Sequence, residues 1–181
     1  MKEFKIEKVF EQDYFNKIQN YFKNHFFLKN ADYDFYNSKR IDSFDDQVLQ
    51  EILNKLHEPA KIWFNNENIV PTYAIFSEYS GKQAHLNPHV DSGPCTYTLD
   101  VGLYHKEPWP LIIEGKEYLF LENEAIGFYA NDQQHWKPEF PDAENNKVGI
   151  LLIHYVDSNH MWLTLKPEVQ KLVRQRIKTL S

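Results

Sequence analysis

Apolar residues in the first third of the chain recur at intervals of three and four positions. This spacing places the aromatic and aliphatic side chains of residues 11–27 on one face, which predicts an amphipathic helix. A polar stretch at residues 29–42 is expected to form a loop. Residues 44–56 then repeat the helical spacing and predict a second helix that ends near Pro59. The same spacing at residues 167–180 predicts a C-terminal helix.

Between the second and third predicted helices the pattern changes to one of strands. Short runs of β-branched and aromatic residues are separated by Gly, Pro, Asn and Asp, which is typical of strands joined by turns. The predicted strands cover residues 69–79, 96–104, 110–113, 118–121, 125–129 and 148–156, and Glu114-Gly115-Lys116 predicts a hairpin turn. This order favours an antiparallel sandwich or barrel braced by helices. The predicted fold class is mainly β with flanking helices, in a single domain over residues 1–181, with a helical part at 1–60, a strand core at about 69–157 and a C-terminal helix at about 167–180.

Composition narrows the range of partners. The chain of 181 residues has a net charge of −6 and no basic run that could follow a phosphate backbone, so nucleic acid is not an expected partner. Cys95 is the only cysteine, which excludes an intramolecular disulfide and a metal cluster built from several thiolates. The first ten residues lack the apolar core of a signal peptide, and no run reaches the roughly 18 apolar residues of a membrane span. We therefore expect a cytoplasmic protein without a membrane partner, and the sequence carries no signal of its oligomeric state.

The segment at residues 84–91 carries the first chemical motif, which ends in His89-Val90-Asp91. In an extended strand, residues i and i+2 point to the same face, so His89 and Asp91 bring an imidazole and a carboxylate to one point. A third ligand must come from elsewhere in the fold. His135, which follows the strand predicted at residues 125–129, is the best candidate. Two histidines and one carboxylate on one face of Fe(II) leave open positions for a co-substrate and O₂.

Other interpretations of these histidines exist. A surface turn, favoured by Pro88, would explain His89 and Asp91 without any metal. His85 lies four residues before His89, a spacing that suits two ligands on a helix, but Pro88 disfavours a helix there. His154 lies in the middle of a predicted strand, where a core histidine is the expected role. A metal site remains the preferred interpretation of the His89 and Asp91 pair.

Further residues stand in a characteristic order around this motif. They are Tyr79, Gly81, Leu86, His89, Asp91, Trp109-Pro110-Leu111, the segment from Tyr129 to His135, and a closing strand. Over residues 73–157 this order resembles the 2-oxoglutarate/Fe(II)-dependent dioxygenase superfamily, in particular its prolyl-hydroxylase-like branch of small bacterial oxygenases.

The resemblance implies a fold, a site and a reaction. The fold is a double-stranded β-helix (jelly roll) with the metal at its open mouth. His89, Asp91 and His135 are the implied metal ligands and catalytic residues. The implied cofactor is Fe(II), with 2-oxoglutarate and O₂ as co-substrates and ascorbate as an assisting reductant. The implied reaction is hydroxylation of an amino acid, a peptide or a small metabolite, with release of succinate and CO₂.

In this family a basic residue about ten positions after the distal histidine binds the 5-carboxylate of 2-oxoglutarate. No Arg stands in that region here, so the candidates are two lysines, each of which could instead be an ordinary surface residue. Lys147 lies 12 residues after His135 and opens the last predicted strand, and family position slightly favours it. Lys137 shares the face of His135 on an extended strand and is the other candidate. Hydroxyl groups that could add a contact to the carboxylate are those of Tyr79, Tyr97 and Tyr129.

Three other functions fit parts of the pattern. A cupin-like jelly-roll metalloenzyme would keep the metal ligands and need neither lysine, so dependence on 2-oxoglutarate separates it from the oxygenase. A non-catalytic jelly-roll module that binds a sugar or a peptide would leave the ligands without a role. A zinc hydrolase could use two histidines and one Asp, but no Glu is placed as its general base. Within the oxygenase family, Asp91 favours hydroxylation, because members that halogenate lack the carboxylate ligand.

Overall fold

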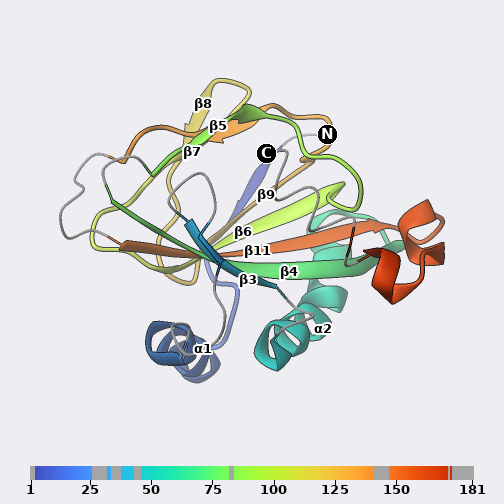
Figure 1. Ribbon diagram of the computed structural model, residues 1–181, viewed down its shortest axis with the longest axis horizontal. Coiled ribbons are helices and arrows are strands. Elements are labelled where there is room, and N and C mark those ends of the chain that lie inside the picture. Colours follow the sequence, from blue (N-terminus) through green and yellow to red (C-terminus); the bar gives the residue numbers. More distant parts are fainter. Residues whose placement is uncertain are drawn as a thin grey trace.

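Two antiparallel sheets form the body of the computed structural model (Figure 1), which describes residues 3–25, 32–33, 38–42, 46–81, 84–140, 147–170 and 172. The larger sheet contains, in spatial order, β1 (Phe4–Ile6), β9 (Ala125–Phe128), β6 (Tyr97–Tyr104), β11 (Lys147–Asp157), β4 (Ile69–Ser80), β3 (Ser38–Asp42) and β2 (Asp32–Tyr33). The smaller sheet contains β5 (Leu86–His89), β10 (His135–Lys137), β7 (Leu111–Ile113) and β8 (Lys116–Tyr118). This arrangement confirms the predicted fold class, a mainly β jelly roll with few helices.

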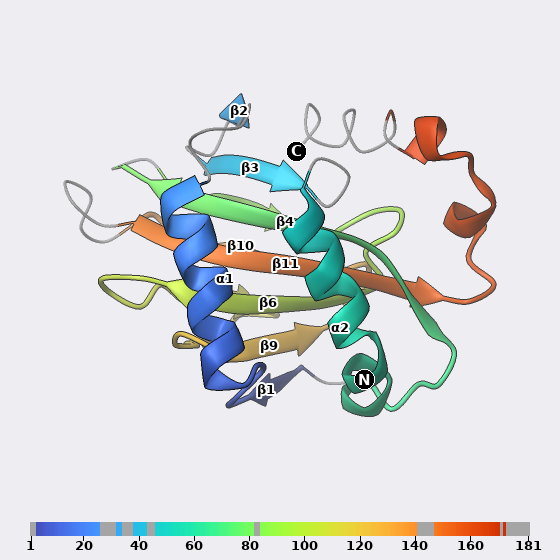
Figure 2. The same ribbon diagram turned by 90° about the horizontal axis from the view of Figure 1, so that it is seen from below.

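Two helices cover one face of the larger sheet, which we call the helix face. α1 (Gln12–His25) and α2 (Gln47–Trp63) lie across its strands (Figure 2). They pack on a buried apolar cluster to which β4, β6 and β11 contribute Phe76, Leu99 and Leu151. The carboxylate of Asp46 caps α2 by accepting hydrogen bonds from two N–H groups of its first turn. Within the described ranges, no helix is both long and apolar enough to cross a membrane.

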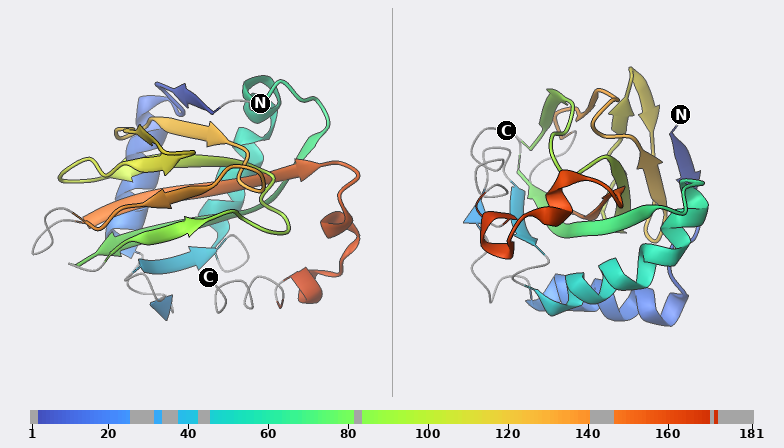
Figure 3. Two further views of the ribbon diagram at one scale, coloured as in Figure 1. Left: turned by 90° about the horizontal axis from the view of Figure 1, so that it is seen from above. Right: turned by 90° about the vertical axis from the view of Figure 1, so that its right-hand side faces the viewer.

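The opposite face of the larger sheet lies toward the smaller sheet (Figure 3), and we call it the enclosed face. Side chains alternate between the two faces along β11. Leu151 and Ile153 belong to the helix-face cluster, whereas Val148 and Ile150 pack in a second cluster with Leu111 of the smaller sheet. The position of a residue along β11 therefore decides whether its side chain enters the space between the sheets.

The helices differ from the prediction at their ends. α2 does not end near Pro59 but continues to Trp63, although Pro59 has no N–H to donate to the preceding turn. Ala60 and Phe64 are buried in the helix-face cluster, and Phe64 N donates to Ala60 O over 2.9 Å. This burial outweighs the loss of one hydrogen bond, so the last turn stays helical. Residues 167–170 and 172 are helical, and the rest of the predicted C-terminal helix lies outside the described residues.

Three short strands, β1, β2 and β3, fall within the part of the chain predicted to be helical or loop. β3 lies in the predicted loop and pairs with β4, with Ile41 opposite Phe76. Its conformation comes from pairing with a distant strand edge rather than from alternation in its own sequence. The β7–β8 hairpin also differs, because Glu114 and Gly115 both have positive φ angles (50° and 78°) and close a two-residue turn, so β8 already begins at Lys116.

Asn123 ties the N-terminal segment to the sheets, and its removal is a test of stability. Its buried side chain accepts a hydrogen bond from Phe10 N and donates one to Phe10 O, both over 2.9 Å. Asn123→Ala is expected to lower the free energy of unfolding by about 3 kcal/mol, because two buried backbone groups lose their partners. A further cost of about 1 kcal/mol comes from the positive φ of 64° at this position. Urea denaturation measures the change.

Asn65 is the matched control, because it is an exposed asparagine with a positive φ of 49°. Asn65→Ala is expected to cost only the backbone contribution, about 1 kcal/mol. Equal losses in the two variants would show that the hydrogen bonds to Phe10 contribute nothing measurable.

Candidate metal centre

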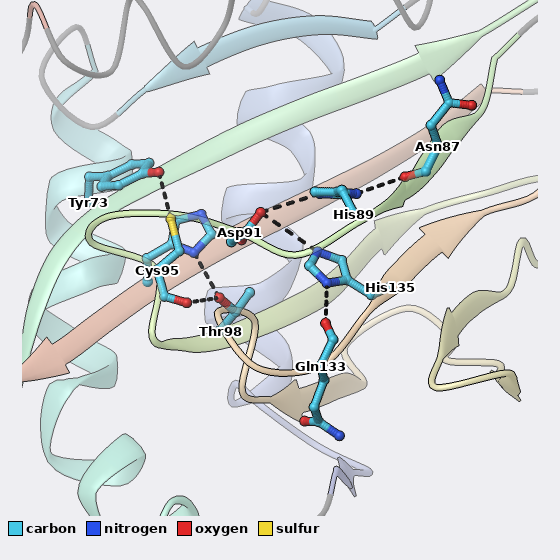
Figure 4. A network of polar contacts seen from close by, with 9 residues as sticks. Tyr73, Asn87, His89, Asp91, Cys95, Thr98, Gln133 and His135 are labelled. Carbon is cyan, nitrogen blue, oxygen red and sulfur yellow. Dashed lines mark hydrogen bonds and ion pairs between the residues drawn. The ribbon is translucent and has the colours of Figure 1, made fainter. Parts of the chain in front are cut away.

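The ends of two paired strands bring the predicted metal ligands together. His89 is the last residue of β5 and His135 is the first residue of β10, and the register of the smaller sheet places them directly opposite each other. Asp91 lies two residues beyond His89, where its backbone N–H donates to Ala130 O over 2.8 Å. This bond holds the chain extended past the end of β5, so that Asp91 faces the same point as the two histidines (Figure 4).

The three side chains converge at metal-ligand distances. Oδ1 of Asp91 lies 3.3 Å from Nε2 of His89 and 3.7 Å from Nε2 of His135. Neighbouring ligands at about 2.1 Å from one metal ion lie about 3 Å apart, so the observed separations are slightly longer than those between bound ligands. The two imidazole rings are 4.2 Å apart between centroids. The sequence prediction that these residues lie together agrees with this geometry.

Backbone carbonyl groups orient both imidazoles. Nδ1 of His89 lies 2.8 Å from Asn87 O, and Nδ1 of His135 lies 3.0 Å from Gln133 O. A carbonyl oxygen only accepts, so each Nδ1 carries a proton and donates it. The lone pair of a neutral ring is then on Nε2, the atom that faces Asp91, which is the arrangement that a metal ligand requires.

Electrostatics of the site favour a bound cation. Burial raises the pKa of Asp91, but the contact with His89 and the charges of neighbouring histidines outweigh this effect and hold the pKa below its usual value. Burial lowers the pKa of His135, and the opposing charge of Asp91 compensates only in part. Ionised carboxylate and neutral imidazole are the forms that bind metals. The His135 side chain is 5% exposed and that of His89 is 29% exposed, so the site opens on the His89 side.

Lys137 is a buried cation on the enclosed side of the smaller sheet. It stands two residues after His135 on β10 and is 2% exposed. Its ammonium lies 4.9 Å from the ring centre of Trp109 and 5.1 Å from that of Phe120, and Nζ has no hydrogen-bond partner in the described part of the chain. Burial lowers the pKa of Lys137 to about 8, although the charge of Asp100 opposes this shift. Lysine is almost never fully buried unless it is paired, and the charge of Asp100 is what partly compensates the burial of this ammonium.

Lys147 lies in a different environment. Its side chain is 51% exposed, and Nζ is 3.4 Å from Oε1 of Glu78. Along β11, Lys147 alternates with Val148 of the enclosed face and shares the side of Leu151, which packs toward the helices. The structure therefore does not bring Lys147 to the same space as His135.

The three predicted tyrosines also divide between the two faces. Tyr79 is buried on the enclosed face, and its ring meets that of Trp109 with centroids 5.0 Å apart. Tyr97 and Tyr129 belong to the helix-face cluster, where both contact Phe64. Only Tyr79 shares the space that contains Lys137.

Four buried polar residues of the enclosed face are absent from the predicted site: Cys95, Thr98, Asp100 and His154. His154 is buried, as expected of a core histidine, and its Nδ1 lies 3.0 Å from Oγ1 of Thr98. Burial raises the pKa of the Cys95 thiol well above its usual value. The signal in the sequence is Thr98 and Asp100, which alternate with Leu99 and Val101 in a strand that is buried on both faces.

Comparison with known proteins finds solved structures of similar fold but no similar sequence. No family model matches the sequence, and comparison with curated proteins finds no match. A viral collagen prolyl hydroxylase from Paramecium Bursaria Chlorella virus-1, solved as a 2-oxoglutarate complex, has 13% identity and a TM-score of 0.59, over 85% of this chain and 95% of that one. A Trichoplax adhaerens prolyl hydroxylase, solved with a peptide fragment of hypoxia inducible factor, has 11% identity and a TM-score of 0.62, over 91% and 87%.

A third similar structure contains a small molecule. EctD from S. alaskensis with 2-oxoglutarate and 5-hydroxyectoine has 12% identity and a TM-score of 0.66, over 86% of this chain and 72% of that one. The likeness to 2-oxoglutarate/Fe(II) oxygenases that these comparisons show is, at such identities, a likeness of fold.

Proposed function

We propose that this chain, which has the fold of the 2-oxoglutarate/Fe(II) oxygenases, is itself a non-haem Fe(II) oxygenase that consumes 2-oxoglutarate. The observation that carries the proposal is the convergence of Nε2 of His89, Nε2 of His135 and a carboxylate oxygen of Asp91. Two imidazoles and one carboxylate on one side of Fe(II) leave positions for a bidentate co-substrate and O₂. Bound Fe(II), together with 2-oxoglutarate and O₂, would supply the oxidant for hydroxylation, with release of succinate and CO₂.

Lys137 is the proposed anchor for the 5-carboxylate of 2-oxoglutarate. Residues i and i+2 of a strand share a face and lie about 7 Å apart, which matches the reach of a five-carbon dicarboxylate whose other end binds at His135. The buried ammonium lacks a hydrogen-bond acceptor among the described residues and would gain one in the carboxylate. Tyr79, in the same cluster as Trp109, would add a hydroxyl contact. This assignment replaces the preference for Lys147, which rested on family position.

The proposed substrate is a small molecule or a peptide side chain. One similar structure contains a peptide fragment and another contains 5-hydroxyectoine, and the proposal extends both classes to this chain. A cytoplasmic location and assistance by ascorbate stay part of the proposal.

Formation of succinate tests the proposed reaction. Purified protein with Fe(II), 2-oxoglutarate and ascorbate in air is expected to form succinate slowly even without a substrate, and His89→Ala is expected to form none above background. Circular dichroism would establish that the variant is folded. Absence of succinate in both proteins, with a calorimetric signal for Mn(II) but none for 2-oxoglutarate, would favour a cupin-like enzyme, and absence of both signals would favour a binding module.

A further inference from the structure

Asp91 belongs to a second group of side chains with metal-binding atoms, which contains Cys95 and His154. One such atom from each of the three residues lies within 4.8 Å of those of the other two. In Figure 4, Cys95 lies on the side of Asp91 away from His89 and His135. We propose that Asp91, Cys95 and His154 form a second metal site, which takes a thiophilic divalent cation such as Zn²⁺ and competes with Fe(II) for Asp91.

The chemistry of the donors differs between the two groups. His89 and His135 supply two imidazoles, whereas the second group supplies one sulfur, one imidazole and the shared carboxylate. Zn²⁺ and Co²⁺ take this mixture in tetrahedral sites, with three protein ligands and a fourth position for water. A sulfur ligand selects thiophilic metals against harder ions. The second group therefore has its own metal preference.

Neighbouring strands hold the second group in place. His154 lies on β11, and the contact of its Nδ1 with Oγ1 of Thr98 on β6 orients the ring so that Nε2 would bind the cation. Tyr73 of β4 places its hydroxyl 3.0 Å from Sγ of Cys95. Gly93, with a φ of 66°, allows the turn that returns the chain from Asp91 to Cys95. A site supported by three adjacent strands is well ordered before the metal arrives.

The two sites cannot be filled independently. Oδ1 of Asp91 faces His89 and His135, so its other carboxylate oxygen is the one that would serve the second cation. Two divalent ions that share one carboxylate repel each other strongly in a partly buried site. Cys95 and His154 are buried, while the Asp91 side chain is 22% exposed, so a cation would reach the second site past Asp91. Occupancy of the second site is therefore expected to weaken binding of Fe(II), and this competition rests on the proposed function.

Cobalt absorption tests the second site without any enzymatic assay. Metal-free full-length protein would be titrated with Co²⁺ under anaerobic conditions, and sulfur-to-cobalt charge transfer would be followed in the near ultraviolet. Because Cys95 is the only cysteine of the chain, this band can come from no other residue. We expect the band in the wild-type protein and in His89→Ala, its loss in Cys95→Ser, and its displacement by Zn²⁺. His154→Gln is expected to raise the dissociation constant for Co²⁺ at this band by about 10-fold or more.

The outcomes separate this inference from the proposed function. A wild-type protein that binds Co²⁺ without a charge-transfer band would overturn the second site, and Cys95 and His154 would then only position Asp91. An unchanged Co²⁺ affinity in His154→Gln would also contradict it. A charge-transfer band in a protein that forms no succinate would support the second site and reject the oxygenase. Far-ultraviolet circular dichroism of each variant excludes loss of the fold as the cause.

Discussion

Asp91→Ala is expected to lower the rate of succinate formation from 2-oxoglutarate by at least about 100-fold. Loss of an outer partner of a metal ligand costs about 10- to 100-fold in metal affinity or activity, and loss of the ligand itself should cost more. Two neutral imidazoles would remain, and neither balances the charge of Fe(II). The initial rate at increasing Fe(II), together with calorimetry of Mn(II) binding, would separate loss of the metal from loss of turnover.

Asp132→Ala is the matched control for this variant. Asp132 is an exposed carboxylate in the turn before His135 and lies outside both groups of metal-binding side chains. It is expected to keep the wild-type rate and metal affinity. If Asp91→Ala kept more than about a tenth of the wild-type rate, Asp91 would not be a ligand of the catalytic metal.

The sequence predicts those parts of the fold in which local pattern and tertiary packing agree. α1 and the long strands β4, β6 and β11 lie close to their predicted ranges, because alternation or helical spacing already marks the face that becomes buried. β3 was predicted as a loop but is a strand. It becomes extended by pairing with the edge of β4, and the residues of β3 carry no local pattern that predicts this pairing. The last helical turn of α2, beyond Pro59, was also not predicted. It is stabilised by the burial of Ala60 and Phe64, which depends on the folded chain and not on local pattern.

Some residues of the candidate site can likewise be predicted from local sequence, and others cannot. The spacing of His89 and Asp91 is local, so their convergence can be predicted from two residues of one strand, and the resemblance supplies His135. The face on which a lysine lies cannot be predicted as well, because a shift of one residue in a strand reverses the direction of every side chain. Lys147 and Val148 illustrate this, since adjacent positions of β11 lead to opposite sides of the sheet. The approach of Cys95 to His154 depends on the turn at Gly93 and on the register of β6 with β11.

Lys137→Met is expected to raise the Michaelis constant for 2-oxoglutarate by about 100-fold, with a smaller change in kcat. Loss of one partner of a buried, hydrogen-bonded charge pair costs about 2–5 kcal/mol, and a 100-fold change corresponds to about 2.8 kcal/mol. Met keeps the length of the side chain and its apolar contacts with Trp109 and Phe120, so the ammonium is the main group removed. Succinate formation at a series of 2-oxoglutarate concentrations measures both constants.

Lys147→Met provides the comparison, because it removes the same charge from a half-exposed position beside Glu78. Its Michaelis constant for 2-oxoglutarate is expected to stay within about twofold of the wild-type value, since Lys147 lies on the side of β11 that faces the helices and not on the enclosed face. The reverse result, a large increase for Lys147→Met and none for Lys137→Met, would make Lys147 the anchor and would require its side chain to turn to the enclosed face when 2-oxoglutarate binds.

No effect of either variant on an active enzyme would mean that neither lysine binds the 5-carboxylate. Lys137 would then be a buried cation whose charge Asp100 partly balances, and the co-substrate would have to be held through hydroxyl groups such as that of Tyr79.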